Sequence, residues 1–208
     1  MEKINLVDAL SELDEDLVVK GVKSQLAENV PAIEILGQLQ KGMEKVGKFY
    51  EEGEYYLSEL IMSADIFSSV ADLLKANMAQ GAELETHGTI VLGTVKDDIH
   101  DIGKNIVATI LGCNGYKVVD VGVDVPIEKF VEAVKEHKPQ VVGMCCLLTT
   151  AFDAMKDTVA AVKAENSAVK ILIGGGPCDN NVAKYCSADY YCKTAYDAVT
   201  LMEGQCKA

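Results

Sequence analysis

Apolar positions in the first 80 or so residues recur at spacings of three and four, without strand-like alternation. This is the pattern of amphipathic helices that each bury one face. Pro31 suits the first turn of such a helix, because its missing N–H and fixed φ are tolerated there. The pattern predicts helices at 4–12, 14–28, 31–51 and 58–80, followed by a polar linker at 82–88.

After Gly88 the pattern changes to short apolar runs that alternate with amphipathic segments. A series of strands and helices in alternation predicts a parallel sheet with right-handed crossovers. We therefore expect an α/β protein whose helical domain, residues 1–85, precedes a flavodoxin-like (Rossmann-like) domain at 88–208 with a five-stranded parallel sheet. The expected strands are 89–95, 117–122, 141–147, 170–174 and 189–192.

Composition narrows the choice of partners and compartment. The net charge is −13 and no basic cluster is present, which argues against binding to nucleic acid or to an anionic membrane. No run approaches the roughly 20 apolar residues of a membrane span, and residues 1–5 lack an apolar signal core. The seven cysteines contain no CxxC pair, so we expect reduced thiols and a cytoplasmic protein.

The most informative motif is Asp98-Ile99-His100-Asp101-Ile102-Gly103, which follows the first expected strand and opens a helix. His100 therefore lies beyond the carboxyl end of that strand, where parallel sheets bind ligands. Asp98 would fix the imidazole tautomer and make the ring a better metal donor. Taken alone, the motif is equally consistent with a loop histidine paired with a nearby aspartate.

Two later segments belong to the same edge of the expected sheet. The run from Val142 to Thr150 covers the third strand and its loop. Gly174-Gly175-Gly176-Pro177 closes the fourth strand, where absent side chains would let a ring system approach the backbone. A plain tight turn would use the same glycines.

Together these segments resemble a known family. The run from Gly93 to Asn105 is similar to the cobalamin-binding signature of methionine synthase, adenosylcobalamin mutases and the small corrinoid methyl-carrier proteins of anaerobic methyltransferase and O-demethylase systems. The resemblance to the methyl carriers extends over essentially the whole chain. It implies that His100 is an axial cobalt ligand that displaces the benzimidazole of cobalamin or a related corrinoid. The implied cofactor-binding residues are Asp98, His100, Asp101, Ile102, Gly103, Cys145, Leu147, Thr149, Gly174, Gly175 and Gly176.

Three positions depart from the family pattern. Asp97 stands where glycine is common, Cys145 where the family has serine, and Ser58 where a proline is common. A thiol is a weaker hydrogen-bond partner than a hydroxyl, which argues against proton relay through Cys145.

The segment 53–64 resembles the most recognisable part of the four-helix cap that covers the corrin in the methyl carriers. The resemblance implies an apolar lid and a hinge near residues 82–88, because a methyl donor must reach the same corrin face. The core of a helix bundle is the alternative for each of these residues. The lid candidates are Tyr56, Leu57, Leu60, Ile61 and Ala64.

The resemblance also implies a function. The chain would carry a methyl group on cobalt from a substrate:corrinoid methyltransferase to an acceptor methyltransferase that uses tetrahydrofolate or coenzyme M, with a reductive activase as third partner. Because cobalt performs the nucleophilic step, no catalytic side chain is expected and the protein is not a complete enzyme. Methyl ethers are the favoured methyl source over methanol, methylamines and betaines. The alternatives are a cobalamin-dependent sensor, a mutase small subunit and a cofactor-free interaction domain.

Overall fold

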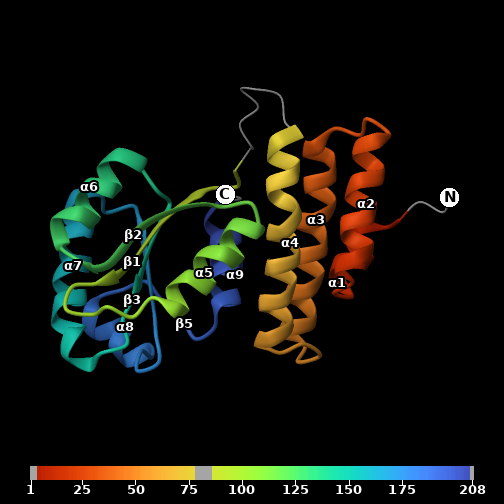
Figure 1. Cartoon of the computed structure of the whole chain (residues 1–208). Coiled ribbons are helices and arrows are strands. Elements are labelled where there is room, and N and C mark those ends of the chain that lie inside the picture. The colour runs from red at the N-terminus through yellow and green to blue at the C-terminus, as the bar shows by residue number, and fades with distance from the viewer. Residues whose placement is uncertain (1–3, 78–85, 207–208) are drawn as a thin grey trace. The chain divides into compact units, whose positions relative to one another are not determined.

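The computed structural model describes residues 4–77 and 86–206. The chain divides into two compact units, Met1–Glu85 and Thr86–Ala208. Helices make up the first unit, and the second holds the strands (Figure 1).

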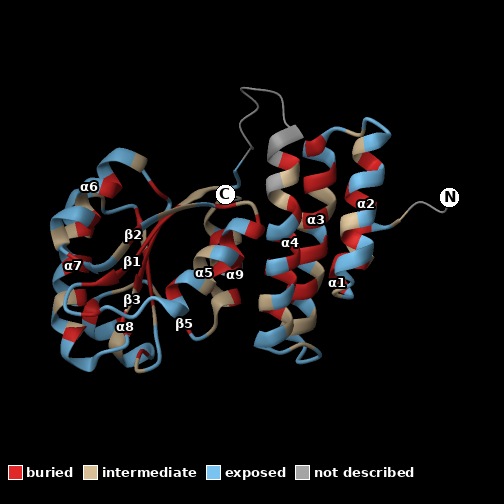
Figure 2. Cartoon of the chain, in the orientation of Figure 1, coloured by how far each residue is buried: buried red, intermediate tan, exposed pale blue. Residues whose placement is uncertain are grey.

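The first unit contains four helices, α1 (Leu6–Ser11), α2 (Glu15–Ala27), α3 (Ala32–Glu51) and α4 (Leu57–Asn77). Side-chain caps begin two of them, because Asn5 accepts from the first turn of α1 and Asp14 from that of α2. The apolar stripe of each helix is buried (Figure 2). A four-helix unit of this kind is what the spacing of apolar residues predicts.

The second unit is built on a five-stranded sheet. Its strands are β1 (Thr89–Val95), β2 (Lys117–Val125), β3 (Val141–Cys145), β4 (Lys170–Gly174) and β5 (Tyr190–Cys192). All neighbouring strands run parallel in the order β2-β1-β3-β4-β5. This order confirms the predicted flavodoxin-like fold, and it places the carboxyl ends of all the strands along one edge.

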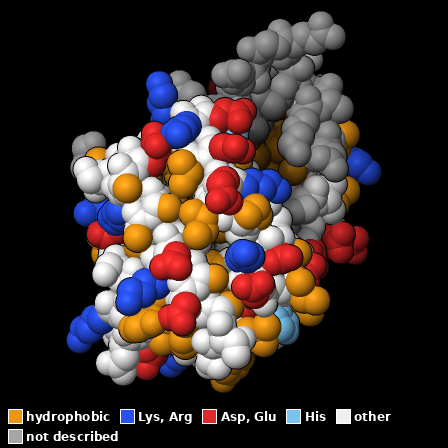
Figure 3. All heavy atoms as spheres, turned by 90° about the vertical axis from the view of Figure 1, so that its left-hand side faces the viewer, with side chains coloured by type: hydrophobic (Ala, Val, Ile, Leu, Met, Phe, Trp, Pro, Cys, Tyr) orange, Lys and Arg blue, Asp and Glu red, His pale blue; other side chains and the backbone are white. Residues whose placement is uncertain are grey.

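Helices cover both faces of the sheet. On one side lie α6 (Ile127–His137), α7 (Phe152–Glu165) and α8 (Asn180–Cys186), and on the other α5 (Ile102–Cys113) and α9 (Ala195–Cys206) (Figure 1). The α6–α8 side holds the main apolar core, which includes Phe130, Met144, Met155 and Ile171. The outer surface over α6 and α7 mixes acidic and basic side chains (Figure 3), as an ordinary solvated face does.

The structure shifts several predicted boundaries. Strand β2 runs to Val125, three residues beyond the expected end at residue 122, and β3 ends at Cys145 instead of residue 147. The expected end of the strand falls at Gly122, whose φ is +98°, and the pairing with β1 shifts register there. The end of the expected fourth helix, 78–80, and most of the expected linker lie outside the described residues. In the described part of the chain, no helix is long and apolar enough to cross a membrane.

Candidate functional site

The loop between β1 and α5 carries the predicted histidine motif. Asp97 has a φ of +67°, a left-handed conformation that glycine adopts freely and aspartate tolerates. Its N–H donates to Asp124 Oδ1 at 2.8 Å, and the Asp124 N–H donates to the Asp98 carbonyl at 2.8 Å. The loop is therefore tied to the end of β2, and the aspartate occupies the position where the family has glycine without breaking these bonds.

Asp98 is the buried centre of the site. Its side chain is fully buried, and both carboxylate oxygens accept hydrogen bonds. Oδ2 accepts from the N–H groups of Leu147 at 2.5 Å and Leu148 at 3.0 Å, and Oδ1 accepts from the His100 N–H at 3.0 Å and from Nδ1 at 2.7 Å. Burial opposes ionisation, but these donors outweigh it and lower the Asp98 pKa to about 2. The carboxylate thus stays ionised at neutral pH.

His100 projects from this anchor toward solvent, with 50% of its side chain exposed. Because an ionised carboxylate can only accept, Nδ1 is the nitrogen that donates, and in the neutral imidazole Nε2 then keeps a lone pair. The Thr94 hydroxyl donates to the His100 carbonyl at 2.7 Å and fixes the backbone of the loop. A metal-binding histidine has this arrangement, with one nitrogen held by a carboxylate and the other free to coordinate.

Exposed apolar side chains surround the histidine. Ile99 and Ile102 flank it in sequence and are 73% and 76% exposed, while Leu147 and Leu148, whose N–H groups bind Asp98, are also exposed. Such a group of large apolar side chains in water indicates a surface that something covers. A flat macrocycle coordinated at Nε2 fits this chemistry.

The glycines near the site differ in how much space a side chain would have. A Cβ on Gly175 would lie 1.9 Å from the Cys146 carbonyl oxygen, and its φ is +129°, so the fold itself requires glycine there. A Cβ on Gly174 would meet the Cys192 carbonyl at 3.3 Å, and one on Gly176 would meet Leu147 Cδ1 at 3.3 Å. A Cβ on Gly103 would meet nothing within 4 Å. The folded chain leaves open space at Gly103, as a ligand-facing position would need.

Cys145 lies on the α5 side of the sheet. It pairs with Thr94 of β1 and with Gly174 of β4, which in turn pairs with Cys192 of β5, so the four residues form a row across four strands. Burial, opposed by the Lys104 charge, raises the Cys145 pKa to about 12, and the thiol stays neutral. The row has one residue without a side chain and three with small side chains, which is compatible with a ligand tail beside it.

The sequence-based reasoning missed Lys104 and Asp120. Lys104 is 4% exposed, and its ammonium binds the Asp120 carboxylate of β2 and Asn105 Oδ1. A signal was present, because Lys104 precedes Val107 and Leu111 by three and seven residues and so shares the apolar face of the helix. A charged residue on that face is expected to be paired.

The remaining predicted residues are less closely tied to His100. Asp101 and Thr149 are exposed, and Asp101 accepts from the Asn105 amide at 3.3 Å. In the helical unit Leu60 and Ala64 are buried, as the alternative of a helix-bundle core describes. Tyr56 and Leu57 are exposed and Ile61 is half-buried, and the role of the five residues in a lid stays a prediction.

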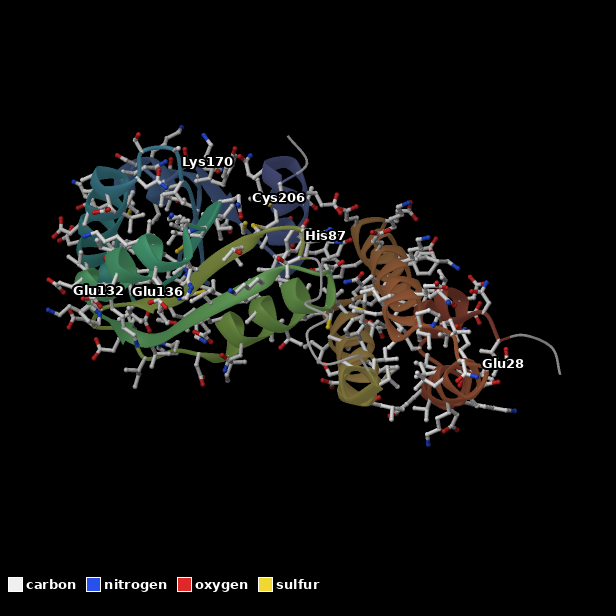
Figure 4. All side chains as sticks on the ribbon, turned by 90° about the horizontal axis from the view of Figure 1, so that it is seen from above. Glu28, His87, Glu132, Glu136, Lys170 and Cys206 are labelled. Carbon is white, nitrogen blue, oxygen red and sulfur yellow. The ribbon has the colours of Figure 1, made fainter. Side chains whose placement is uncertain are left out.

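A concavity lies at the opposite edge of the sheet, near the starts of β3 and β4. It has a volume of about 250 Å³, and residues such as Gln140, Lys170 and Gln205 line it. Figure 4 labels Lys170 at this edge. Gln140 already binds the Thr89 backbone, and Gln205 binds the Tyr190 hydroxyl. These groups are used within the fold, and the histidine site lies at the other edge.

Fold and site together define a class: an α/β protein with a parallel sheet that presents a carboxylate-anchored, half-exposed histidine at its carboxyl edge. Family comparison gives the same result, because residues 88–200 match the B12 binding domain and residues 5–75 match a second B12 binding domain model. The chain belongs to the family of B12-binding corrinoid proteins.

Known relatives cover both units. Dimethylamine corrinoid protein 2 of Methanosarcina acetivorans is 37% identical over 196 residues, which are 93% of this chain and 91% of the relative. Trimethylamine corrinoid protein 1 of the same organism is 34% identical, with coverage of 93% and 91%. The amines in these names are those of the relatives and are not assigned to this chain.

Solved structures agree in fold. A cobalamin-binding protein from Desulfitobacterium hafniense is 37% identical, with a TM-score of 0.78 and 96% coverage of both chains. A chain of the methanol:cobalamin methyltransferase complex from Methanosarcina barkeri is 32% identical, with a TM-score of 0.82, and the match covers 96% of this chain and 79% of that one.

Proposed function

We propose that this protein binds cobalamin or a related corrinoid with His100 as the lower cobalt ligand, and that it carries a methyl group between two methyltransferases. The observation that carries the proposal is the Asp98–His100 pair, which leaves Nε2 exposed among apolar side chains. When bound, the corrinoid supplies a cobalt ion that accepts and donates the methyl group.

Different residues of the site would hold different parts of the corrinoid. His100 would coordinate the cobalt through Nε2 in place of the benzimidazole, and Asp98 would keep the proton on Nδ1 and fix the direction of the ring. The exposed side chains of Ile99, Ile102 and Leu147 would shield the bound corrinoid from water. No side chain is needed as an acid, base or nucleophile, so the protein acts as the carrier subunit of an enzyme system.

Partners follow from the carrier role: a substrate:corrinoid methyltransferase, an acceptor methyltransferase that uses tetrahydrofolate or coenzyme M, and a reductive activase. The names of the relatives put dimethylamine and trimethylamine ahead of methyl ethers as donors to test first. The described cysteines are all free thiols, which fits a cytoplasmic protein.

Methyl exchange tests the carrier role. The cobalamin-loaded, reduced chain is mixed with a methylamine-specific methyltransferase and its amine, and then with a coenzyme M or tetrahydrofolate methyltransferase. We expect the absorbance of the methylated cofactor to appear in the first step and to disappear as the acceptor is methylated in the second. If the loaded protein exchanges no methyl group under conditions in which free cobalamin does, the carrier role is wrong and a sensor becomes the better reading.

A further inference from the structure

Among the residues of the α/β unit whose burial the structure describes, Lys104 is the one buried lysine or arginine. Removing an ammonium from water costs several kcal/mol, typically more than one partly hydrated partner returns. Its partner Asp120 keeps 39% of its side chain exposed, against 3% for Lys104. Water can hydrate the Asp120 carboxylate, so this ion pair alone does not explain why the Lys104 ammonium is buried.

The lysine lies on the side of the sheet that faces α5. Asp120 pairs with Leu92, and Thr94 pairs with Cys145. Because alternate residues of a strand share a face, Asp120, Leu92, Thr94 and Cys145 all point to this side. The ammonium binds Asp120 and also lowers the pKa of the Cys145 thiol against the larger effect of burial. Its charge therefore acts over the end of β1, between β2 and β3.

A corrinoid whose lower base is displaced brings an anion to this region. Its nucleotide tail contains a phosphodiester with one negative charge, and under the proposed function the tail runs from the corrin at His100 toward the row that contains Cys145 and Gly174. A phosphate that leaves water for a protein surface needs a cation.

We propose that Lys104 neutralises the phosphodiester of the corrinoid nucleotide tail, and that Asp120 holds the ammonium only until the cofactor arrives. This inference rests on the proposed function and adds a residue that selects complete corrinoids over those without a nucleotide. Lysine suits the exchange, because its three donors rotate about a flexible stem. Asn105 Oδ1, at 2.7 Å, remains a partner throughout.

Asp120 can release the lysine at small cost. Its Oδ1 accepts from the Gly122 N–H at 2.9 Å, and its exposed oxygen can be hydrated. The Asp120 carboxylate therefore neutralises Lys104 in the cofactor-free protein, and the phosphodiester takes its place when the corrinoid binds.

A comparison of two corrinoids isolates the contribution of the nucleotide tail, with its phosphate, to binding. Hydroxocobalamin contains the nucleotide tail, whereas cobinamide has the same corrin but lacks the phosphate, the ribose and the base. The dissociation constant of each is measured by absorbance titration of the full chain. We expect Lys104→Met to weaken cobalamin binding by about tenfold or more, the cost of one charge-assisted hydrogen bond, and to leave cobinamide binding unchanged.

Three further variants keep the test decisive. Lys104→Arg retains the charge and should keep most of the preference for cobalamin. Asp120→Asn frees the ammonium and should bind cobalamin at least as tightly as the wild type. Lys129→Gln is the matched control, because Lys129 also bonds to β2, through the Val121 carbonyl, but belongs to α6 on the other side of the sheet. It should change neither dissociation constant.

A purely structural latch gives a different pattern. If Lys104 only fastens α5 to β2, Lys104→Met and Asp120→Asn weaken both corrinoids equally and lower the melting temperature of the empty protein together. That result overturns the inference, as does unchanged cobalamin binding by Lys104→Met. Failure of the proposed function is distinguishable, because then the wild-type chain retains no cobalamin at all.

Discussion

A buried carboxylate is the residue on which the histidine site depends. Asp98 has its pKa lowered from 3.8 to about 2, because four N–H donors outweigh the effect of burial. A depressed pKa stabilises the folded chain at pH values above the unfolded value, and this contribution is lost as the pH falls from 3.8 toward 2. The shift corresponds to about 2 kcal/mol.

Asp98→Asn tests this linkage in the empty protein. We expect the wild type to lose about 2 kcal/mol of unfolding free energy, relative to the variant, between pH 4 and pH 2. Urea denaturation at a series of pH values measures the difference. Parallel stability curves for the two proteins would show that Asp98 is not held ionised by these donors.

The close backbone contact at Gly175 leads to a second prediction for a single residue. Alanine there places a Cβ 1.9 Å from the Cys146 carbonyl oxygen at a φ of +129°, and the backbone must move. We expect Gly175→Ala to lower the unfolding free energy by about 3 kcal/mol or more. The control is Gly112→Ala in α5, where the new Cβ has nothing within 4 Å and should stabilise by up to about 1 kcal/mol. Equal stabilities would contradict the close approach.

The sequence reveals residues of the site more readily than their partners. His100 and Asp98 are two positions apart, so their hydrogen bond follows from local spacing. The N–H groups of Leu147 and Leu148 come from a loop about 50 positions away, and only the parallel pairing of β1 with β3 brings them to Asp98. Such contacts depend on register, which no local pattern specifies.

At the scale of elements, regular apolar periodicity predicts well and irregular backbone does not. The helices and the strand order follow from spacing and from crossover rules. The end of β2 does not, because Gly122 and Asp124 look like turn residues although Val125 still pairs with Val95. A bulge inserts such residues without ending the strand.

Helix α4 offers a matched pair of leucines. Leu60 is fully buried and Leu57 is 46% exposed. We expect Leu60→Ala to cost about 2–5 kcal/mol of unfolding free energy. Leu57→Ala should cost less than about 1 kcal/mol, because little apolar area leaves the core. Thermal unfolding of both variants measures the difference, and similar losses would mean that Leu57 is a core residue and not part of a lid.

At the scale of the whole molecule, two units with separate apolar cores each match a B12 binding domain model. The sequence resemblance extends over both, and the relatives cover more than nine-tenths of this chain. The fold class and the family were therefore predictable from sequence. The methyl donor was not, because under the proposed function a partner enzyme selects it, and the chain then needs no residue pattern for the donor.

Coordination of cobalt by His100 is the feature on which the proposed function depends, and the chain provides its own controls. It contains three histidines, so His87→Ala and His137→Ala can be compared with His100→Ala. The measurement is an anaerobic ultraviolet–visible spectrum after incubation with hydroxocobalamin and removal of free cofactor. We predict stoichiometric corrinoid with a histidine-ligated spectrum for the wild type and both controls, and loss of that spectrum in His100→Ala alone. Coordination by His100 is contradicted if His100→Ala keeps the wild-type spectrum, and corrinoid binding is contradicted if the wild type retains no corrinoid.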